Sequence, residues 1–327
     1  WSAPTKLFNV ANLPNGYRYA WNPLFNNFNL TQGNWVAPPT LQMQTGTGYI
    51  ARTFNGSDTA ITLPFSFNGQ PNNGSITSVN VSRGAYFGDG ITTGLPYDAE
   101  PSNPNNVNTT RWDDNWNLVG NPYPSALNAE AFLDENTNLE GFINLWTHDS
   151  EPNLTNDPFY ADFAYNYDTD DYITYNGTAT INGPTGFNGN IASGQGFFVL
   201  MADGPAATQS IEFNNAMRSD LVNNLVYDNS QFYRTTNGVN QATDVVEKSR
   251  IWLDIVSAQG QVSRTVVGYV TEATNNKDRL YDAVTGAKGL KLYSFTEDYE
   301  LQEFCIQGRA LPFVNTDTVR LGFNVTA

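Results

Sequence analysis

Acidic and amide side chains recur at alternate positions in two short polar segments of this 327-residue chain. The first segment is DENTNLEG at 134–141, and the second is DTDDY at 168–172. Calcium takes several oxygen ligands from carboxylates, side-chain amides and carbonyls, so either segment could hold this ion. Neither has a glycine at position six and a final glutamate at position twelve, as a complete EF-hand loop does, and ordinary solvated turns use the same residue types. The candidate ligands are Asp134, Asn136, Asn138, Asp168, Asp170 and Asp171.

A histidine beside acids is the next candidate for chemistry. His148 is the one histidine of the chain and is followed by Asp149, a pairing that suits a general base or a metal ligand. A zinc site needs several histidine or cysteine ligands, and this sequence does not offer them. We therefore expect His148 to make a structural hydrogen bond at the end of a strand.

Two further patterns resemble catalytic motifs only in part. The stretch Gly194-Gln195-Gly196 precedes an expected strand, whereas the dinucleotide-binding glycine loop follows a strand and opens a helix. The acidic pairs at 113–114 and 170–171 could serve glycoside hydrolysis only if two carboxylates faced each other across a cleft. Because 32 acidic residues produce such pairs by chance, we predict that the chain is not an enzyme.

Aromatic side chains offer a different use, the stacking of sugar rings. Trp21, Trp35 and Trp112 lie in polar, turn-rich surroundings. If they formed an exposed row, they would indicate a module that binds or processes surface polysaccharide, and this stays open as an alternative function.

Charge and composition limit the remaining partners. The formal net charge is −16 and Lys and Arg total only 16, which argues against nucleic-acid binding and against anionic membranes. No apolar run approaches the roughly 20 residues of a membrane helix, so we expect no membrane insertion. The single cysteine, Cys305, excludes intrachain disulfides and lies in an alternating apolar run, so we expect a buried, inert thiol.

The elements that carry these residues are mostly short strands bounded by turn residues, which predicts a mainly β fold of antiparallel β-sandwich or jelly-roll-like domains. Asn128 can cap one short helix over 128–136, with Ala131 and Phe132 facing the sheet. In NWNLVGNPYPS (115–125), a strand ends where Pro122 interrupts it, so we expect a structural corner that leads into the helix. The expected strands of the first unit are 48–54, 60–67, 75–82, 116–120, 142–148, 172–177, 194–201 and 210–218.

Asparagine and lysine usage indicates a boundary between two units. There are 38 asparagines in 1–240 and 4 in 241–327, while four of the five lysines follow residue 247. We predict an Asn-rich β domain at 1–218, a connector at 219–246 with one strand near 231–234, and a second β-sandwich at 247–327. The expected strands of the second unit are 250–258, 262–270, 290–295, 300–308 and 318–325, and the first two should form a hairpin.

Several long phrases of the sequence carry a family resemblance. WNLVGNPYPSALNAEAFL, LWTH, IASGQGFFV, FNNAMR and RIWLDI are similar to phrases of large surface proteins exported by the type IX secretion system. VGYVTEATNNKDRLYDA and VRLGF resemble a later element of the same proteins, so the resemblance covers roughly residues 45–327. In that family these phrases lie just upstream of a C-terminal sorting domain.

The resemblance implies a non-catalytic, extracellular structural or adhesive module whose partners are the type IX machinery and neighbouring domains or subunits. It also implies O-glycosylation at Asp-Thr-aliphatic triplets, here at Thr59 and Thr318, although both triplets are equally well explained as plain turns. Because the chain opens on Trp1 and stops within an expected strand, we expect an excised segment whose second sandwich is incomplete at its C-terminal end. Three alternatives stay open for the missing part: it is cleaved, it is not visible, or a strand from a neighbour replaces it. The last alternative gives the third function left open, a subunit of an extracellular filament built by strand addition.

Overall fold

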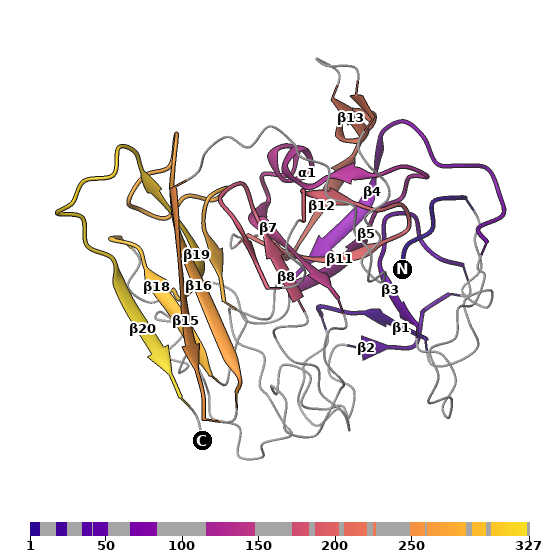
Figure 1. Ribbon diagram of the computed structural model, residues 1–327. Coiled ribbons are helices and arrows are strands. Elements are labelled where there is room, and N and C mark those ends of the chain that lie inside the picture. The colour runs from indigo at the N-terminus through magenta and orange to yellow at the C-terminus, as the bar shows by residue number, and fades with distance from the viewer. Residues whose placement is uncertain are drawn as a thin grey trace.

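The computed structural model is a mainly β structure built of antiparallel sheets (Figure 1). The described part contains one short α-helix. This confirms the fold class predicted from the strand pattern. In this part of the chain, no helix is long and apolar enough to span a membrane. The structure describes residues 1–6, 18–24, 35–40, 42–51, 66–83, 116–147, 172–182, 187–202, 206–220, 225–226, 249–258, 260–285, 290–298 and 302–325.

A five-stranded antiparallel sheet forms the middle layer of the molecule. In order across the sheet, its strands are β5 (Trp116–Gly120), β11 (Gly196–Met201), β7 (Leu139–Trp146), β8 (Tyr172–Tyr175) and β9 (Thr180–Ile181). Successive side chains point to opposite faces, so Val199 joins one apolar cluster and Phe198 joins another. Because both faces are covered, the strand FFVLM is apolar at every position rather than at alternate ones.

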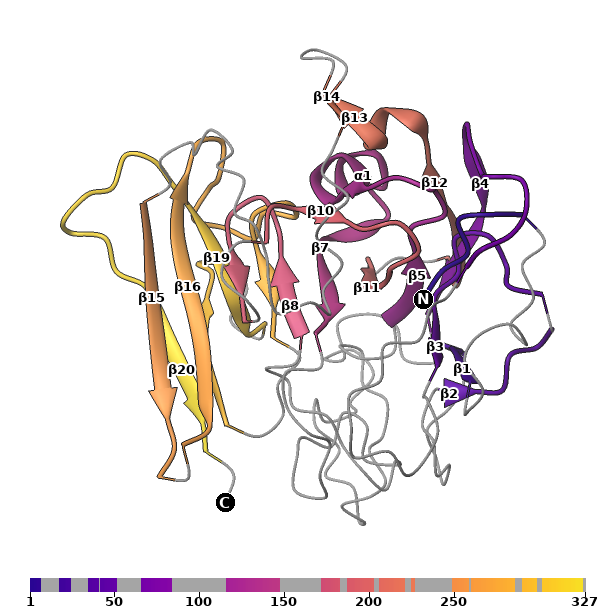
Figure 2. The same ribbon diagram turned by 45° about the vertical axis from the view of Figure 1, so that its right-hand side comes forward.

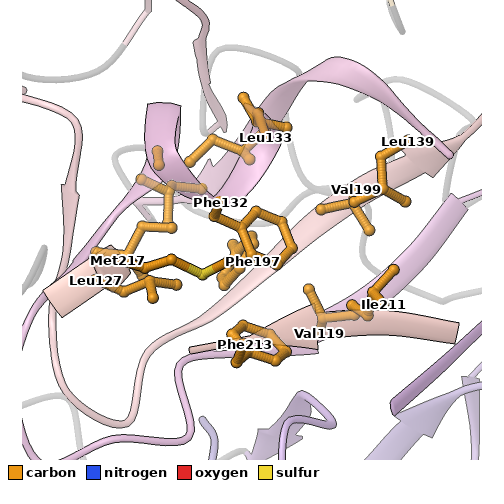
Figure 3. Packing of buried hydrophobic residues seen from close by; sticks show 14 of the residues in the cluster. Val119, Leu127, Phe132, Leu133, Leu139, Phe197, Val199, Ile211, Phe213 and Met217 are labelled. Carbon is orange, nitrogen blue, oxygen red and sulfur yellow. The ribbon is translucent and has the colours of Figure 1, made fainter. Parts of the chain in front are cut away.

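The first cluster lies between this sheet and an outer layer made of helix α1 (Ala129–Glu135) and the antiparallel pair β4 (Ile76–Ser82) and β12 (Thr208–Phe213). Phe132 of the helix is fully buried at its centre (Figure 3). Its ring stacks on Phe213 at 5.0 Å and meets Phe197 edge-on at 5.4 Å. A short 3₁₀ helix, η4 (Asn215–Arg218), follows β12 and adds Met217 to the cluster.

The predicted corner after β5 leads into the helix as expected. The side chain of Asn121 accepts a hydrogen bond from the backbone N–H of Tyr123, and its amide donates to the carbonyls of Ser125 and Ile191. Tyr123 is fully buried, and its hydroxyl donates to the carbonyl of Gly74 at 2.6 Å. The side chain of Asn128 then caps the helix by accepting from the N–H of Ala131.

The second unit supplies a six-stranded sheet on the other side of the middle layer (Figures 1 and 2). Strands β15 and β16 form the predicted hairpin, β16 and β19 are parallel, and the remaining pairs are antiparallel. Its strands are β15 (Ser249–Val256), β16 (Val262–Val270), β17 (Ala283–Val284), β18 (Lys291–Phe295), β19 (Phe304–Ala310) and β20 (Arg320–Asn324).

The two units share an apolar core that crosses the composition boundary. The second apolar cluster joins Trp116, Phe142 and Phe198 of the middle sheet to residues of β16, β17 and β19, among them Phe304 and Ile306. The molecule is therefore layered as an outer layer, a central sheet and the sheet of the second unit. The sequence boundary near residue 247 precedes a new sheet, and apolar residues of that sheet join the second cluster.

A loop between β16 and β17 fastens the second unit to the first. The guanidinium of Arg279 donates to the carbonyls of Leu133 and Leu139 at 3.1 Å each, and Lys277 forms an ion pair with Glu140. Gly141 of β7 makes room for this loop, because a Cβ atom there would lie 1.8 Å from the carbonyl oxygen of Arg279. Residue 141 must therefore lack a side chain for the loop to dock.

Three small sheets complete the described structure. Residues 60–65 and 231–234 lie outside the described ranges, so the strand predicted at 231–234 and most of the one predicted at 60–67 stay predictions; Ser66 and Phe67 are not in a strand. The small sheets consist of β1 (Arg18–Trp21), β2 (Trp35–Val36) and β3 (Tyr49–Ala51), of β6 (Leu127–Asn128) with β10 (Asn190–Ile191), and of β13 (Ser219–Asp220) with β14 (Leu225–Val226).

Candidate interaction surface

The predicted calcium ligands on the first segment serve as links between elements. The amide of Asn136 donates to the carbonyls of Phe132 and Glu212, each at 2.9 Å, and its Oδ1 accepts from the N–H of Glu212 at 2.7 Å. The amide of Asn138 donates to the carbonyl of Ser210. Both asparagines therefore fasten the end of helix α1 to strand β12.

Asp134, the third predicted ligand in this segment, is exposed on the helix. Its pKa is raised by partial burial and by the nearby carboxylate of Glu130. Across the described ranges, no three His, Cys, Asp or Glu side chains gather into a group that could hold a metal ion. Asp168, Asp170 and Asp171 lie outside those ranges, so a calcium site there stays a prediction.

Trp21 and Trp35 pack on each other at the edge of the second apolar cluster. Both are half-buried, their ring planes meet at 83°, and their centroids lie 5.0 Å apart. Trp21 also meets Phe198 edge-on, and its indole N–H donates to the carbonyl of Trp116. These two rings are therefore not the coplanar, exposed row that sugar stacking requires, and Trp112 lies outside the described residues.

Thr318 is exposed in the connection that precedes β20, and Thr59 lies outside the described residues. The neighbour of Thr318, Asp317, accepts two hydrogen bonds from the buried guanidinium of Arg309, at 2.9 and 2.6 Å, and one from the hydroxyl of Tyr269. The hydrogen bonds from Arg309 are the main cause of the lowered pKa of Asp317. This connection is therefore held against β16 and β19 while Thr318 faces solvent.

Of the other candidates for chemistry, some have structural roles and the rest lie outside the described residues. Gly194 has a left-handed backbone with φ +72°, and its carbonyl accepts from the N–H of Ser2 at 2.7 Å in the turn that precedes β11. Cys305 is buried, and burial raises the pKa of its thiol to about 12, as expected for an inert cysteine. His148 and the acidic pairs at 113–114 and 170–171 lie outside the described residues.

The most distinctive surface of the described chain is apolar and belongs to the second unit. Eleven large hydrophobic side chains are exposed in the described part, and ten of them lie after residue 248. A surface this rich in exposed apolar groups usually marks a contact with another molecule. The ten are Ile251, Trp252, Val256, Val262, Leu311, Phe313, Val314, Leu321, Phe323 and Val325, and we call them the apolar end surface.

Strands β15, β16 and β20 and the connection 311–319 carry the apolar end surface, with Val325 one residue beyond β20. Strands β15 and β20 are the two edges of the six-stranded sheet, and the connection 311–319 packs on the sheet where Phe313 meets the ring of Tyr269 edge-on. Both views place these strands at the end of the molecule farthest from β4 (Figures 1 and 2). The surface therefore lies opposite the outer layer of the first unit.

The exposure of these residues was not predicted from the sequence. The alternation in RLGFNV predicts a strand with one apolar face, and β20 confirms the strand. Alternation does not say whether that face is covered, because covering depends on which elements pack against it.

Comparison with known proteins gives a family without an assigned function. A family described as a domain of unknown function (DUF8693) matches residues 1–327. No curated protein and no solved structure matches the chain.

Proposed function

We propose that this chain, which belongs to the DUF8693 family, is a non-catalytic structural or adhesive module of an extracellular surface protein exported by type IX secretion. The proposal combines the resemblance of the sequence phrases with one structural observation. That observation is the apolar end surface, which gathers ten of the eleven exposed large hydrophobic side chains of the described part.

Apolar groups that stay in water carry an unfavourable free energy, and this favours an interaction that covers them. Covering apolar surface is worth roughly 25 cal/mol per Å² removed from water, and a monomer rarely exposes a contiguous apolar patch of more than a few hundred Å². Other apolar side chains of the same sheet, among them Phe304 and Ile306, are already covered in the second apolar cluster. A module whose sheet buries some apolar side chains and leaves others uncovered on its edge strands is suited to joining a further molecule.

The first unit supports a structural role because its polar side chains mainly hold elements together. Asn117 bonds both the N–H and the carbonyl of Ser82, and Asn136 bonds Phe132 and Glu212. These buried amides replace backbone pairing where strands and the helix end. In the described part of the first unit, asparagine side chains such as these therefore have a structural role.

The location part of the proposal is tested in cells that produce the intact parent protein. An epitope inserted next to the exposed Thr318 should be accessible to antibody on whole wild-type cells. In a strain without a working type IX translocon, the same epitope should be reached only after the outer membrane is opened. Equal surface display in both strains, or a cytoplasmic location, would overturn the proposed export route.

A polysaccharide array tests the carbohydrate alternative. The proposal expects no glycan to bind, because Trp21 and Trp35 pack on each other and on Phe198. Binding that is lost in a Trp112→Ala variant would favour a carbohydrate-binding module instead.

A further inference from the structure

Strand β20 is an open edge whose exposed face is apolar. Within the described residues it pairs only with β18, in a register that places Leu321 opposite Ser294 and Phe323 opposite Leu292. Leu321 and Phe323 lie on one face because side chains alternate along a strand, and Val325 follows two residues later, just beyond the strand. These three side chains are 47%, 67% and 59% exposed. An edge strand of this kind is a template for pairing with another chain.

The two edge strands of this sheet differ in the residues that discourage pairing with another chain. On β15, Asp254 forms a bidentate ion pair with Arg264, which places charge on the strand. On the segment 318–325, TVRLGFNV, Arg320 is the only charged residue, and there is no proline. The β20 edge therefore carries one charged residue and no proline, so it has few of the devices by which proteins discourage edge-to-edge pairing.

We propose that β20 pairs with β20 of a second copy of this chain, antiparallel and centred on Gly322. This register places Leu321 opposite Phe323 of the partner copy, and Val319 opposite Val325. Every residue on the apolar face then meets an apolar residue, and such cross-strand pairs stabilise a sheet. Arg320 falls opposite Asn324 rather than opposite a second Arg320, so like charges are not paired.

The centre of the proposed pairing is also sterically suitable. A Cβ atom on Gly322 would lie 2.3 Å from the ring of Tyr293, so the glycine lets this ring cover the strand. On the same face as Gly322, the guanidinium of Arg320 lies 5.8 Å from the centroid of the ring of Phe295. These aromatic rings support β20 from the side opposite Leu321 and Phe323, which leaves the apolar face available to a partner.

The area that the pairing covers predicts a weak dimer. Three large apolar side chains that are half to two-thirds exposed present on the order of 300 Å² per copy. With the paired backbone, both copies together bury on the order of 1,000 Å², which is the low end for specific interfaces. We therefore expect a dissociation constant in the micromolar range, and we expect salt to strengthen the dimer by screening the net charge of −16 on each copy.

This inference deepens the proposed function, because it names the partner of part of the apolar end surface and rests on that surface being an interaction surface. The two can fail separately. Surface display tests the export route, and self-association of the purified chain tests the pairing.

The first test is sedimentation equilibrium over the micromolar range. Wild-type chain should form a dimer, and Phe323→Lys should be monomeric, because it places an exposed charge at the centre of the contact. Val256→Lys is the matched control, since Val256 is equally exposed, at 61%, but lies on β15. A strictly monomeric wild type would overturn the proposal and would leave the β20 edge to a strand of a different polypeptide. Equal loss of the dimer in both variants would also overturn it.

The second test fixes the register through disulfide formation. Opposite residues have Cβ atoms about 4.5–5.5 Å apart and diagonal ones lie about 7–8 Å apart, whereas a disulfide needs about 3.5–4.5 Å. A mixture of Leu321→Cys and Phe323→Cys chains should therefore form a disulfide-linked heterodimer rapidly, and Leu321→Cys alone should not. Equal rates in both samples, or no cross-link in either, would overturn the proposed register.

Discussion

Removal of the Asn136 side chain should destabilise the protein whether or not calcium is present. The side chain is buried and makes three hydrogen bonds, two as donor to the carbonyls of Phe132 and Glu212 and one as acceptor from the N–H of Glu212. A typical hydrogen bond contributes about 0.5–1.5 kcal/mol, and a buried partner left unsatisfied costs more. We expect Asn136→Ala to lower the free energy of unfolding by about 2–4 kcal/mol.

The assay is urea denaturation followed by tryptophan fluorescence, in EDTA and in millimolar calcium. Asn138→Ala is the control, because its amide makes one hydrogen bond, to Ser210, at a half-buried site. That control should lose about 0.5–1 kcal/mol. If Asn136→Ala stayed within about 0.5 kcal/mol of wild type, or lost stability only when calcium was present, the structural role of this residue would be refuted.

Three further predictions concern the core, the junction of the two units and pH. Phe132→Ala should lower the free energy of unfolding by about 3–5 kcal/mol in the same assay, while the exposed Glu135→Ala should change it by less than about 0.5 kcal/mol. Gly141→Ala should lower the free energy of unfolding by at least about 3 kcal/mol, because its Cβ would meet the backbone of Arg279. The control Gly177→Ala should lower it less, because its Cβ would make only ordinary contacts. Equal thermal midpoints of the two variants would contradict the docked loop. Burial raises the pKa of Asp282 to about 7, so its contribution to stability is present at low pH and lost as pH rises from about 4 to 7; denaturation at several pH values should show this slope in wild type and not in Asp282→Asn.

Much of the fold could be predicted because local patterns decided it. The strand at 116–120, the hairpin of β15 and β16 and the helix capped by Asn128 are confirmed, since turn residues and capping chemistry act over a few residues. In β5, Trp116 joins the second apolar cluster and Val119 the first, so both faces of this strand are covered. Leu133 was not predicted to face the core, yet it is buried between the helix and the sheet.

The site and the junction of the units depend on long-range packing that local patterns do not contain. Alternation predicted that Phe304 lies in a strand, but not that its ring packs against the central sheet of the first unit. Asn136 has the residue type of a calcium ligand, and only the approach of β12 gives its amide three backbone partners. Likewise, Phe323 has the pattern of a buried strand residue, and its exposure follows from the position of β20 at the edge of the sheet.

Hydrogen exchange of β20 at low and high protein concentration is the decisive measurement of whether this edge is an interaction surface. If this edge is an interaction surface, backbone amides at 319–325 should exchange more slowly at concentrations above the dissociation constant, whereas amides of β15 should keep the same rates. The Phe323→Lys variant should show no concentration dependence in either strand. Unchanged exchange at 319–325 across the concentration range, or equal slowing in β15 and β20, would contradict the account.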